Sequence, residues 1–154
     1  MKKFCIRFSV FGLLVAVLQL LPNIIWALKP PVMNVLAGNA SSIPFVEYGE
    51  HILGVLIVVL LVLLVNRKQQ SGIPRTHWTV IGFAAIVLYW LCWMLYFDGV
   101  QVYAVIYAMV ILPPVAFFCV GLAKSVWPIP VASVFFLVFH LLTVLENFPV
   151  SMWK

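Results

Sequence analysis

Residues 41–65, SSIPFVEYGEHILGVLIVVLLVLLV, determine what kind of protein this chain is. The segment begins with polar, helix-starting residues and continues as an apolar run that can cross a bilayer if a helix starts near Pro44. Its polar part holds two of the four acids and one of the three histidines, as Glu47, Glu50 and His51. In a helix these positions are i, i+3 and i+4, so their side chains share one face. The segment therefore predicts a membrane helix with two carboxylates and an imidazole at its mouth.

The composition indicates that the rest of the chain also lies in a membrane. Of the 154 residues, 66% are apolar and 8% are charged, whereas a soluble domain has roughly 25% charged residues. The mean hydropathy of +1.18 leaves too little polar surface for a domain in water, so we expect membrane lipids to surround most of the chain. The net charge of +5 does not indicate nucleic-acid binding, because the basic residues are spread among the loops.

Five apolar segments are long enough to span a bilayer. The first segment follows a basic N-terminus, as the apolar part of a signal peptide does. It is longer than the apolar part of a signal peptide usually is, so we predict that it is retained as a span. The turn signal Asp98-Gly99 separates the third segment from the fourth. We predict an all-α fold, a single membrane domain over residues 1–154. Its five transmembrane helices are expected at about 8–28, 44–65, 78–97, 100–123 and 128–147.

The basic residues predict how the bundle is oriented. With the N-terminus in the cytoplasm and the C-terminus outside, the outer side holds only Lys29 and Lys154 of the nine basic residues. The same orientation places all four acids outside. This bias follows the positive-inside rule, and it predicts a multi-pass protein of a bacterial plasma membrane. The seven basic residues of the inner side are Lys2, Lys3, Arg7, Arg67, Lys68, Arg75 and Lys124.

The end of the first span resembles a pattern in a group of bacterial membrane proteins. The residues that carry the resemblance are Leu21, Pro22, Asn23, Trp26, Pro30 and Pro31. This spacing is similar to the pattern that follows the first span in small multi-span membrane proteins of Gram-positive bacteria. The resemblance covers this short segment and the multi-span layout. It implies a helical membrane fold and no particular activity.

The predicted outer side collects the candidate binding residues. Carboxylates, imidazoles and an amide there would form a pocket open to the outside, for a cation, an amine or another small amphiphilic ligand. Alternatively, the acids are simply solvated among the lipid headgroups. The ligand-binding candidates are Glu47, Glu50, His51, Asp98, Gln101, His140 and Glu146.

Glu47, Glu50 and His51 are also the candidates for a metal site. Carboxylates and imidazole at this spacing suit Zn²⁺ or Mn²⁺, but the chain has no HExxH or CxxC motif. The metal question stays open at this point. We expect no cofactor, because His51 and His140 lie at different predicted depths and would not ligate one haem.

His140 lies inside the fifth predicted span, in its outer half. An ionisable group at membrane depth is costly and usually faces the interior of the bundle. One interpretation is that His140 relays protons or contacts a ligand. The alternative is that its imidazole is neutral and donates a hydrogen bond to a helix carbonyl that a proline leaves without a partner. The aromatic residues of the third and fourth spans are interpreted as packing and interface residues rather than as a pocket.

Small residues four positions apart predict flat helix faces. Gly12 with Ala16, and Ala104 with Ala108, have the spacing that lets membrane helices approach closely. Such faces suit a membrane-protein partner or a second copy of the chain.

Three classes of function remain. The favoured one is a non-enzymatic binding or accessory protein that uses the outward-facing acidic and aromatic pocket or a lateral helix face. It is favoured because the sequence has no recognisable nucleophile–base pair, phosphate loop or paired cysteines. The second is an oligomeric small transporter or channel for cations or amines, which the proline breaks in the first and fourth spans suggest. The third is an intramembrane metal-dependent enzyme.

Overall fold

The computed structural model describes residues 4–68 and 72–149. The prediction of an all-α fold with five helices is confirmed, and each helix is long and apolar enough to cross a membrane. The helices are α1 (Val10–Leu28), α2 (Pro44–Leu63), α3 (His77–Phe97), α4 (Tyr103–Ala123) and α5 (Pro128–Asn147). Lys2, Lys3 and Lys154, which contribute to the predicted orientation, lie outside the described residues.

Polar residues and prolines set where the helices begin. The Ser9 hydroxyl accepts a hydrogen bond of 3.0 Å from the Gly12 N–H and caps α1. Thr76 caps α3 in the same way. Pro44 and Pro128 occupy first-turn positions of α2 and α5, where a missing N–H costs nothing.

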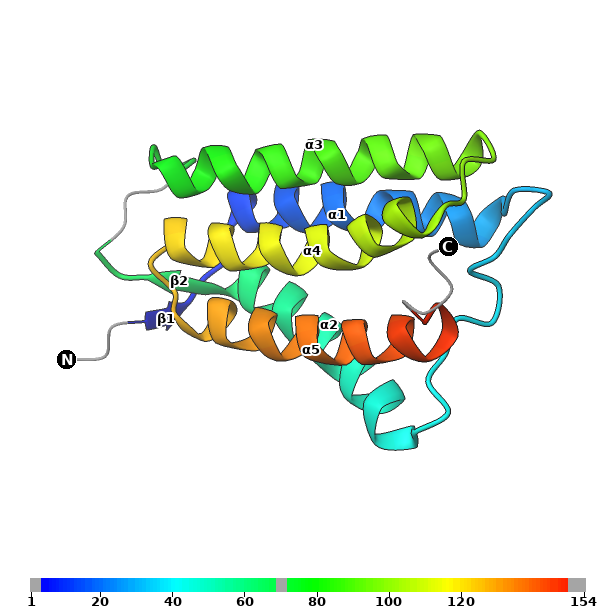
Figure 1. Ribbon diagram of the computed structural model, residues 1–154. Helices are drawn as coiled ribbons and strands as arrows, with labels where there is room; N and C mark the ends of the chain where they lie inside the picture. Colours follow the sequence, from blue (N-terminus) through cyan, green and yellow to red (C-terminus); the bar gives the residue numbers. More distant parts are fainter. Residues whose placement is uncertain (1–3, 69–71, 150–154) are drawn as a thin grey trace.

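The five helices form a ring around a shared interior (Figure 1). Helix α3 packs against α4, α4 against α5, α5 against α2, and α2 against α1, and α1 closes the ring by contacting α3. In Figure 1, α2 runs obliquely to the other helices. A segment at one end of the bundle, residues 29–43, connects α1 to α2.

The structure differs from the prediction at the end of the second span, which was expected to continue to residue 65. Helix α2 ends at Leu63, and Leu64–Asn66 forms a short strand, β2, antiparallel to Phe4–Ile6, β1. The chain before α1 caps the helix end: the Arg7 N–H donates to the Leu63 carbonyl (2.9 Å) and the Ser9 N–H to the Val62 carbonyl (2.8 Å). Pairing with the N-terminal segment thus replaces the last turn of the helix.

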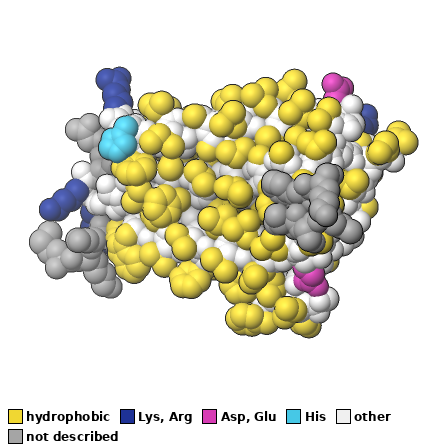
Figure 2. All heavy atoms as spheres, viewed as in Figure 1, with side chains coloured by type: hydrophobic (Ala, Val, Ile, Leu, Met, Phe, Trp, Pro, Cys, Tyr) yellow, Lys and Arg dark blue, Asp and Glu magenta, His cyan; other side chains and the backbone are white. Residues whose placement is uncertain are grey.

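The charged residues divide between the two ends of the bundle (Figure 2). We call one end the basic end. Its basic side chains are Arg7, Arg67, Lys68, Arg75 and Lys124. The other, acidic end is where α1, α3 and α5 finish and where α2 and α4 begin. It carries Glu47, Glu50, Asp98 and Glu146, together with Lys29. Figure 2 shows a broad hydrophobic surface between the two ends.

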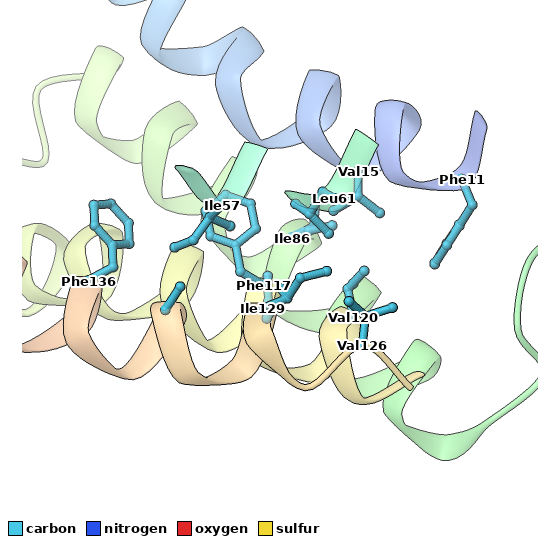
Figure 3. Packing of buried hydrophobic residues seen from close by; sticks show 13 residues of the cluster. Phe11, Val15, Ile57, Leu61, Ile86, Phe117, Val120, Val126, Ile129 and Phe136 are labelled. Atoms are coloured by element: carbon cyan, nitrogen blue, oxygen red, sulfur yellow. The ribbon is translucent and has the colours of Figure 1, made fainter. Parts of the chain in front are cut away.

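The half of the interior next to the basic end is a closely packed apolar core (Figure 3). Phe11 and Val15 of α1 meet Ile57 and Leu61 of α2 there, and Ile129 is among the residues that α5 contributes. A Cβ atom added at Gly12 would lie 1.8 Å from the Leu61 carbonyl oxygen, so the two backbones touch at this crossing. The small face predicted at Gly12 therefore serves packing within the chain.

Candidate functional site

A cavity of about 260 Å³ occupies the half of the interior towards the acidic end. All five helices and the 29–43 segment line it. Phe117 and Phe136, which belong to the closely packed core in Figure 3, border the cavity on the side of the basic end. Leu36 and Asn39 of the 29–43 segment border it at the acidic end. The cavity therefore lies between the apolar core and the connecting segment.

Three side chains that line this cavity carry buried polar atoms without a hydrogen-bond partner among the described residues. They are both amide atoms of Gln19, the indole nitrogen of Trp93 and the amide oxygen of Asn39. Gln19 is 2% exposed and Trp93 is 4% exposed. Leaving a buried polar group unpaired costs about 1–3 kcal/mol. The lining thus offers donors and acceptors to whatever occupies the cavity.

A second set of polar groups in the lining is already paired. The Asn23 side-chain amide donates a hydrogen bond of 2.9 Å to the Tyr89 hydroxyl, which joins α1 to α3. Both residues border the cavity. No Asp, Glu, Lys or Arg side chain is among the described lining residues. A cationic group in this cavity would therefore find no acidic side chain among the described lining residues.

His140 is the predicted site residue that borders the cavity. Its Nδ1 lies 2.8 Å from Glu50 Oε1, and the ring stacks on Phe136 with 4.7 Å between centroids. The Thr143 hydroxyl donates to Glu50 Oε2 at 2.6 Å. Both oxygens of the Glu50 carboxylate thus contact side chains of α5. Because Nδ1 of His140 faces Glu50, Nε2 is the imidazole nitrogen that remains for a ligand.

Glu47, Glu50 and His51 share one helix face but do not converge on a single point. Glu50 bonds to His140 and Thr143 on α5, whereas the His51 ring nitrogen lies 3.6 Å from Glu47 and 2.9 Å from its carbonyl oxygen. Within residues 4–68 and 72–149, no three His, Cys, Asp or Glu side chains are grouped so as to hold a metal ion. The geometry gives the metal-site hypothesis no support.

Glu47 and Glu146 hold the connecting segment in place. Glu47 accepts a hydrogen bond of 2.8 Å from the Ser41 N–H. Glu146 accepts one of 2.8 Å from the Ser41 hydroxyl and one of 2.9 Å from the Ser42 N–H. The Asn147 amide donates to the Ala40 carbonyl at 3.0 Å. These acids are neither isolated charges nor part of the cavity lining; they fix the segment that covers the cavity.

The first part of the same segment is fastened to α1, to α3 and to the turn between α3 and α4. The Asn34 amide oxygen accepts hydrogen bonds from the Trp26 indole (2.9 Å) and the Tyr96 hydroxyl (2.7 Å). Gln101 accepts a hydrogen bond from the Val35 N–H at 3.3 Å. Asp98 is an exposed residue at the turn after α3 and shares no contact with the other acids in the described part of the chain.

The sequence predicted that these polar groups lie together at one end of the bundle, but it did not identify Gln19 as a lining residue. Gln19 is an amide between apolar neighbours in a predicted span, and a polar residue there usually faces the interior; that was the available signal. Asn39 gave no signal, because it lies in an irregular segment. Trp93 and Tyr89 were interpreted as packing residues, and the structure shows that they also border the cavity.

Chemically, the arrangement is a mostly apolar and aromatic chamber with a few hydrogen-bonding groups, which is the usual composition of a small-molecule site. Comparisons of the chain with protein-family models, with curated proteins and with solved structures find no match.

Proposed function

We propose that the protein is an integral membrane binding protein that holds a small, neutral amphiphile in its central cavity. The observation that carries this proposal is Gln19, whose amide is 2% exposed, borders the cavity and has no partner among the described residues for either polar atom. An amide at membrane depth offers two N–H donors and a carbonyl acceptor to a hydroxyl or carbonyl group. A ligand with such a headgroup and an apolar body matches the lining.

The size of the cavity agrees with a small molecule. An apolar protein cavity of about 150 Å³ already holds benzene, so the 260 Å³ found here accommodates a ring-sized group. The Trp93 indole would donate to the headgroup and His140 Nε2 would offer a third polar contact. The absence of acidic side chains from the described lining favours a neutral amphiphile over the cationic ligand that the sequence also suggested.

The proposed ligand enters from the lipid. Leu20 borders the cavity and is 40% exposed on the outer surface of α1. Val58 of α2 borders the cavity and is half-buried. These side chains mark a lateral route between α1 and α2 that would not require the 29–43 segment to move.

The proposal includes an orientation and a location. The basic end would face the cytoplasm and the acidic end the outside of a bacterial plasma membrane, in keeping with the positive-inside rule. A partner or a second copy remains a separate proposal. Ala104, which is exposed on α4, belongs to the small-residue face that the structure leaves at the surface, whereas Ala16 is 2% exposed within the bundle.

Native mass spectrometry of gently extracted protein, with analysis of its organic extract, tests the proposal. The wild type should carry one neutral amphiphile per chain. Gln19→Leu removes the amide while keeping a similar volume, and it should reduce the occupancy about tenfold, because a lost hydrogen bond and an unpaired ligand group together cost about 1–3 kcal/mol. Val17→Ala, a change to an exposed residue of α1 that does not line the cavity, is the control and should retain the molecule. A wild type that carries no such molecule would contradict the proposal.

A small transporter is the second candidate, because a proline break borders the cavity. Pro113 and Met109 of α4 both line it, and Pro113 removes the hydrogen bond that the Met109 carbonyl would otherwise accept. Breaks of this kind accompany substrate sites in transporters. Uptake of the extracted amphiphile into protein-free and protein-containing liposomes separates the candidates: a binding protein retains the molecule, whereas a transporter moves it to the lumen.

A further inference from the structure

A second cavity, of about 240 Å³, lies at the basic end of the bundle. It shares no lining residue with the central cavity. The segment that leads into α1 forms one wall, with Arg7 and Ser9, and Ile73 and Pro74 ahead of α3 border another side. Lys124, at the end of α4, also lines it.

Lys124 is the unusual residue of this cavity, because it is a cation that is only 3% exposed. Its Nζ donates to the Leu61 carbonyl, one of the carbonyls left without a helical partner where α2 ends. An ammonium group has three donors, and this is the one hydrogen bond that Nζ makes to the described residues. Burial lowers the pKa of Lys124 from its ordinary value of 10.5 to about 8. The described residues therefore compensate a charged Lys124 only in part, through this one hydrogen bond.

No acidic side chain of the chain can supply that compensation. The sequence has four acids, and Glu47, Glu50, Asp98 and Glu146 all lie at the acidic end. The ion pairs between described residues join only histidines to Glu47 and Glu50. A buried charge is costly unless it is paired, so an anion from outside the chain is the available partner for Lys124.

The other lining groups suit a phosphate group in particular. Arg7 is exposed, and its guanidinium matches a phosphate in a two-pronged geometry while the Lys124 ammonium acts as a point charge. The Ser9 hydroxyl accepts from the Gly12 N–H and keeps its own hydrogen to donate. Phe8, Val10 and Leu14 add apolar surface beside these groups.

We propose that the cavity lined by Arg7, Ser9 and Lys124 binds the phosphate group of an anionic ligand. The location, beside the last turn of α2 and next to Ile73 and Pro74 ahead of α3, fits the headgroup of an anionic phospholipid. A soluble phosphate offers the same chemistry from the aqueous side. The binding site is independent of the central cavity, and either site can fail a test without affecting the other.

The test uses the full chain in nanodiscs of phosphatidylcholine, with or without phosphatidylglycerol, and native mass spectrometry of the released complex. The wild type should keep one phosphatidylglycerol in preference to phosphatidylcholine. Lys124→Gln keeps a donor for the Leu61 carbonyl but loses the charge, and it should weaken retention about tenfold. Arg7→Gln changes an exposed side chain, so it tests the same point without a risk to folding. Arg67→Gln removes an exposed charge at the same end and is the matched control.

A second arm distinguishes the two sources of phosphate. Thermal unfolding in phosphatidylcholine nanodiscs is compared in inorganic phosphate and in chloride at equal ionic strength. If the wild type retains phosphatidylglycerol and both Arg7→Gln and Lys124→Gln lose it, the site binds lipid. If inorganic phosphate stabilises the wild type and the same two variants lose this stabilisation, the site binds a soluble anion. If the wild type prefers neither phosphatidylglycerol nor phosphate, or if Arg67→Gln loses as much as the two cavity variants, the proposal is wrong.

Discussion

His140 and Glu50 face each other across the contact between α5 and α2, with 2.8 Å between Nδ1 and Oε1. Thr143, one helical turn beyond His140, donates to the other carboxylate oxygen. The group joins the two helices next to the central cavity, because His140 also borders that cavity. The polar groups that connect α2 to α5 thus also orient one wall of the proposed binding site.

A double-mutant cycle measures the interaction between these two side chains. His140→Phe keeps a ring against Phe136 but removes the contact with Glu50, and Glu50→Leu removes the carboxylate. Each single change should destabilise the protein by roughly 1–3 kcal/mol, less than the 3–5 kcal/mol for fully buried pairs, because the His140 and Glu50 side chains are 25% and 17% exposed. Detergent-induced unfolding should give a coupling of roughly 1 kcal/mol. Strictly additive losses would show that the contact contributes no stability.

Because α1 and α2 cross so closely, replacing Gly12 by alanine should lower the stability of the protein. Gly12→Ala places a Cβ atom 1.8 Å from the Leu61 carbonyl oxygen, and the Lys124 ammonium that binds this oxygen would also have to move. We expect a loss of about 1–3 kcal/mol, the usual cost of overpacking. Gly54→Ala is the matched control, because its Cβ would lie 3.6 Å from the nearest atom, on Phe136. Equal unfolding midpoints for the two variants would contradict this account of the crossing.

The stability of the protein should rise with pH in the alkaline range. Burial lowers the pKa of Lys124 to about 8 in the folded protein, against 10.5 ordinarily. Between these values the unfolded chain binds more protons than the folded chain, so the free energy of unfolding increases as the pH rises. Thermal unfolding in phosphatidylcholine nanodiscs should show this slope for the wild type, and Lys124→Gln should reduce it. A bound anionic lipid should also flatten the slope, because it favours the charged lysine.

The connecting segment should loosen when Asn34 is removed. Asn34→Ala deletes the acceptor for both the Trp26 indole and the Tyr96 hydroxyl, and hydrogen exchange of residues 29–43 should become faster while the helices keep their protection. Val32→Ala is the control, since the Val32 side chain is fully exposed. Unchanged exchange in Asn34→Ala would show that the other contacts of the segment, with Gln101, Glu47 and Glu146, suffice to hold it.

The helices could be predicted from the sequence for a physical reason. In lipid every backbone polar group must be satisfied within the protein, so an apolar run of sufficient length is almost always a helix. The same reasoning failed at residues 64–66, because β2 depends on the distant β1. The start of α2 depends on a distant residue as well: Ile43 occupies the cap position, and the hydroxyl of the nearby Ser41 bonds to Glu146.

The cavity could not be predicted, because it depends on how five helix faces meet. Gln19 stands between apolar neighbours in the sequence, and nothing local shows that Trp93 and Asn39 lie around the same space. Similarly, Glu47 and Glu50 have equivalent positions on one helix face. Their different roles come from their partners, which are Ser41 in one case and His140 in the other.

The most direct test of the central claim is to fill the cavity from within. Gly54 borders it, and a leucine there would project its side chain into the space that the proposed amphiphile occupies; Gly54→Ala adds only a methyl group at ordinary contact distance. We predict that the wild type and Gly54→Ala retain one neutral amphiphile per chain in native mass spectrometry, and that Gly54→Leu folds but retains none. Equal retention by Gly54→Leu, or none by the wild type, would contradict the account of the cavity as a binding site.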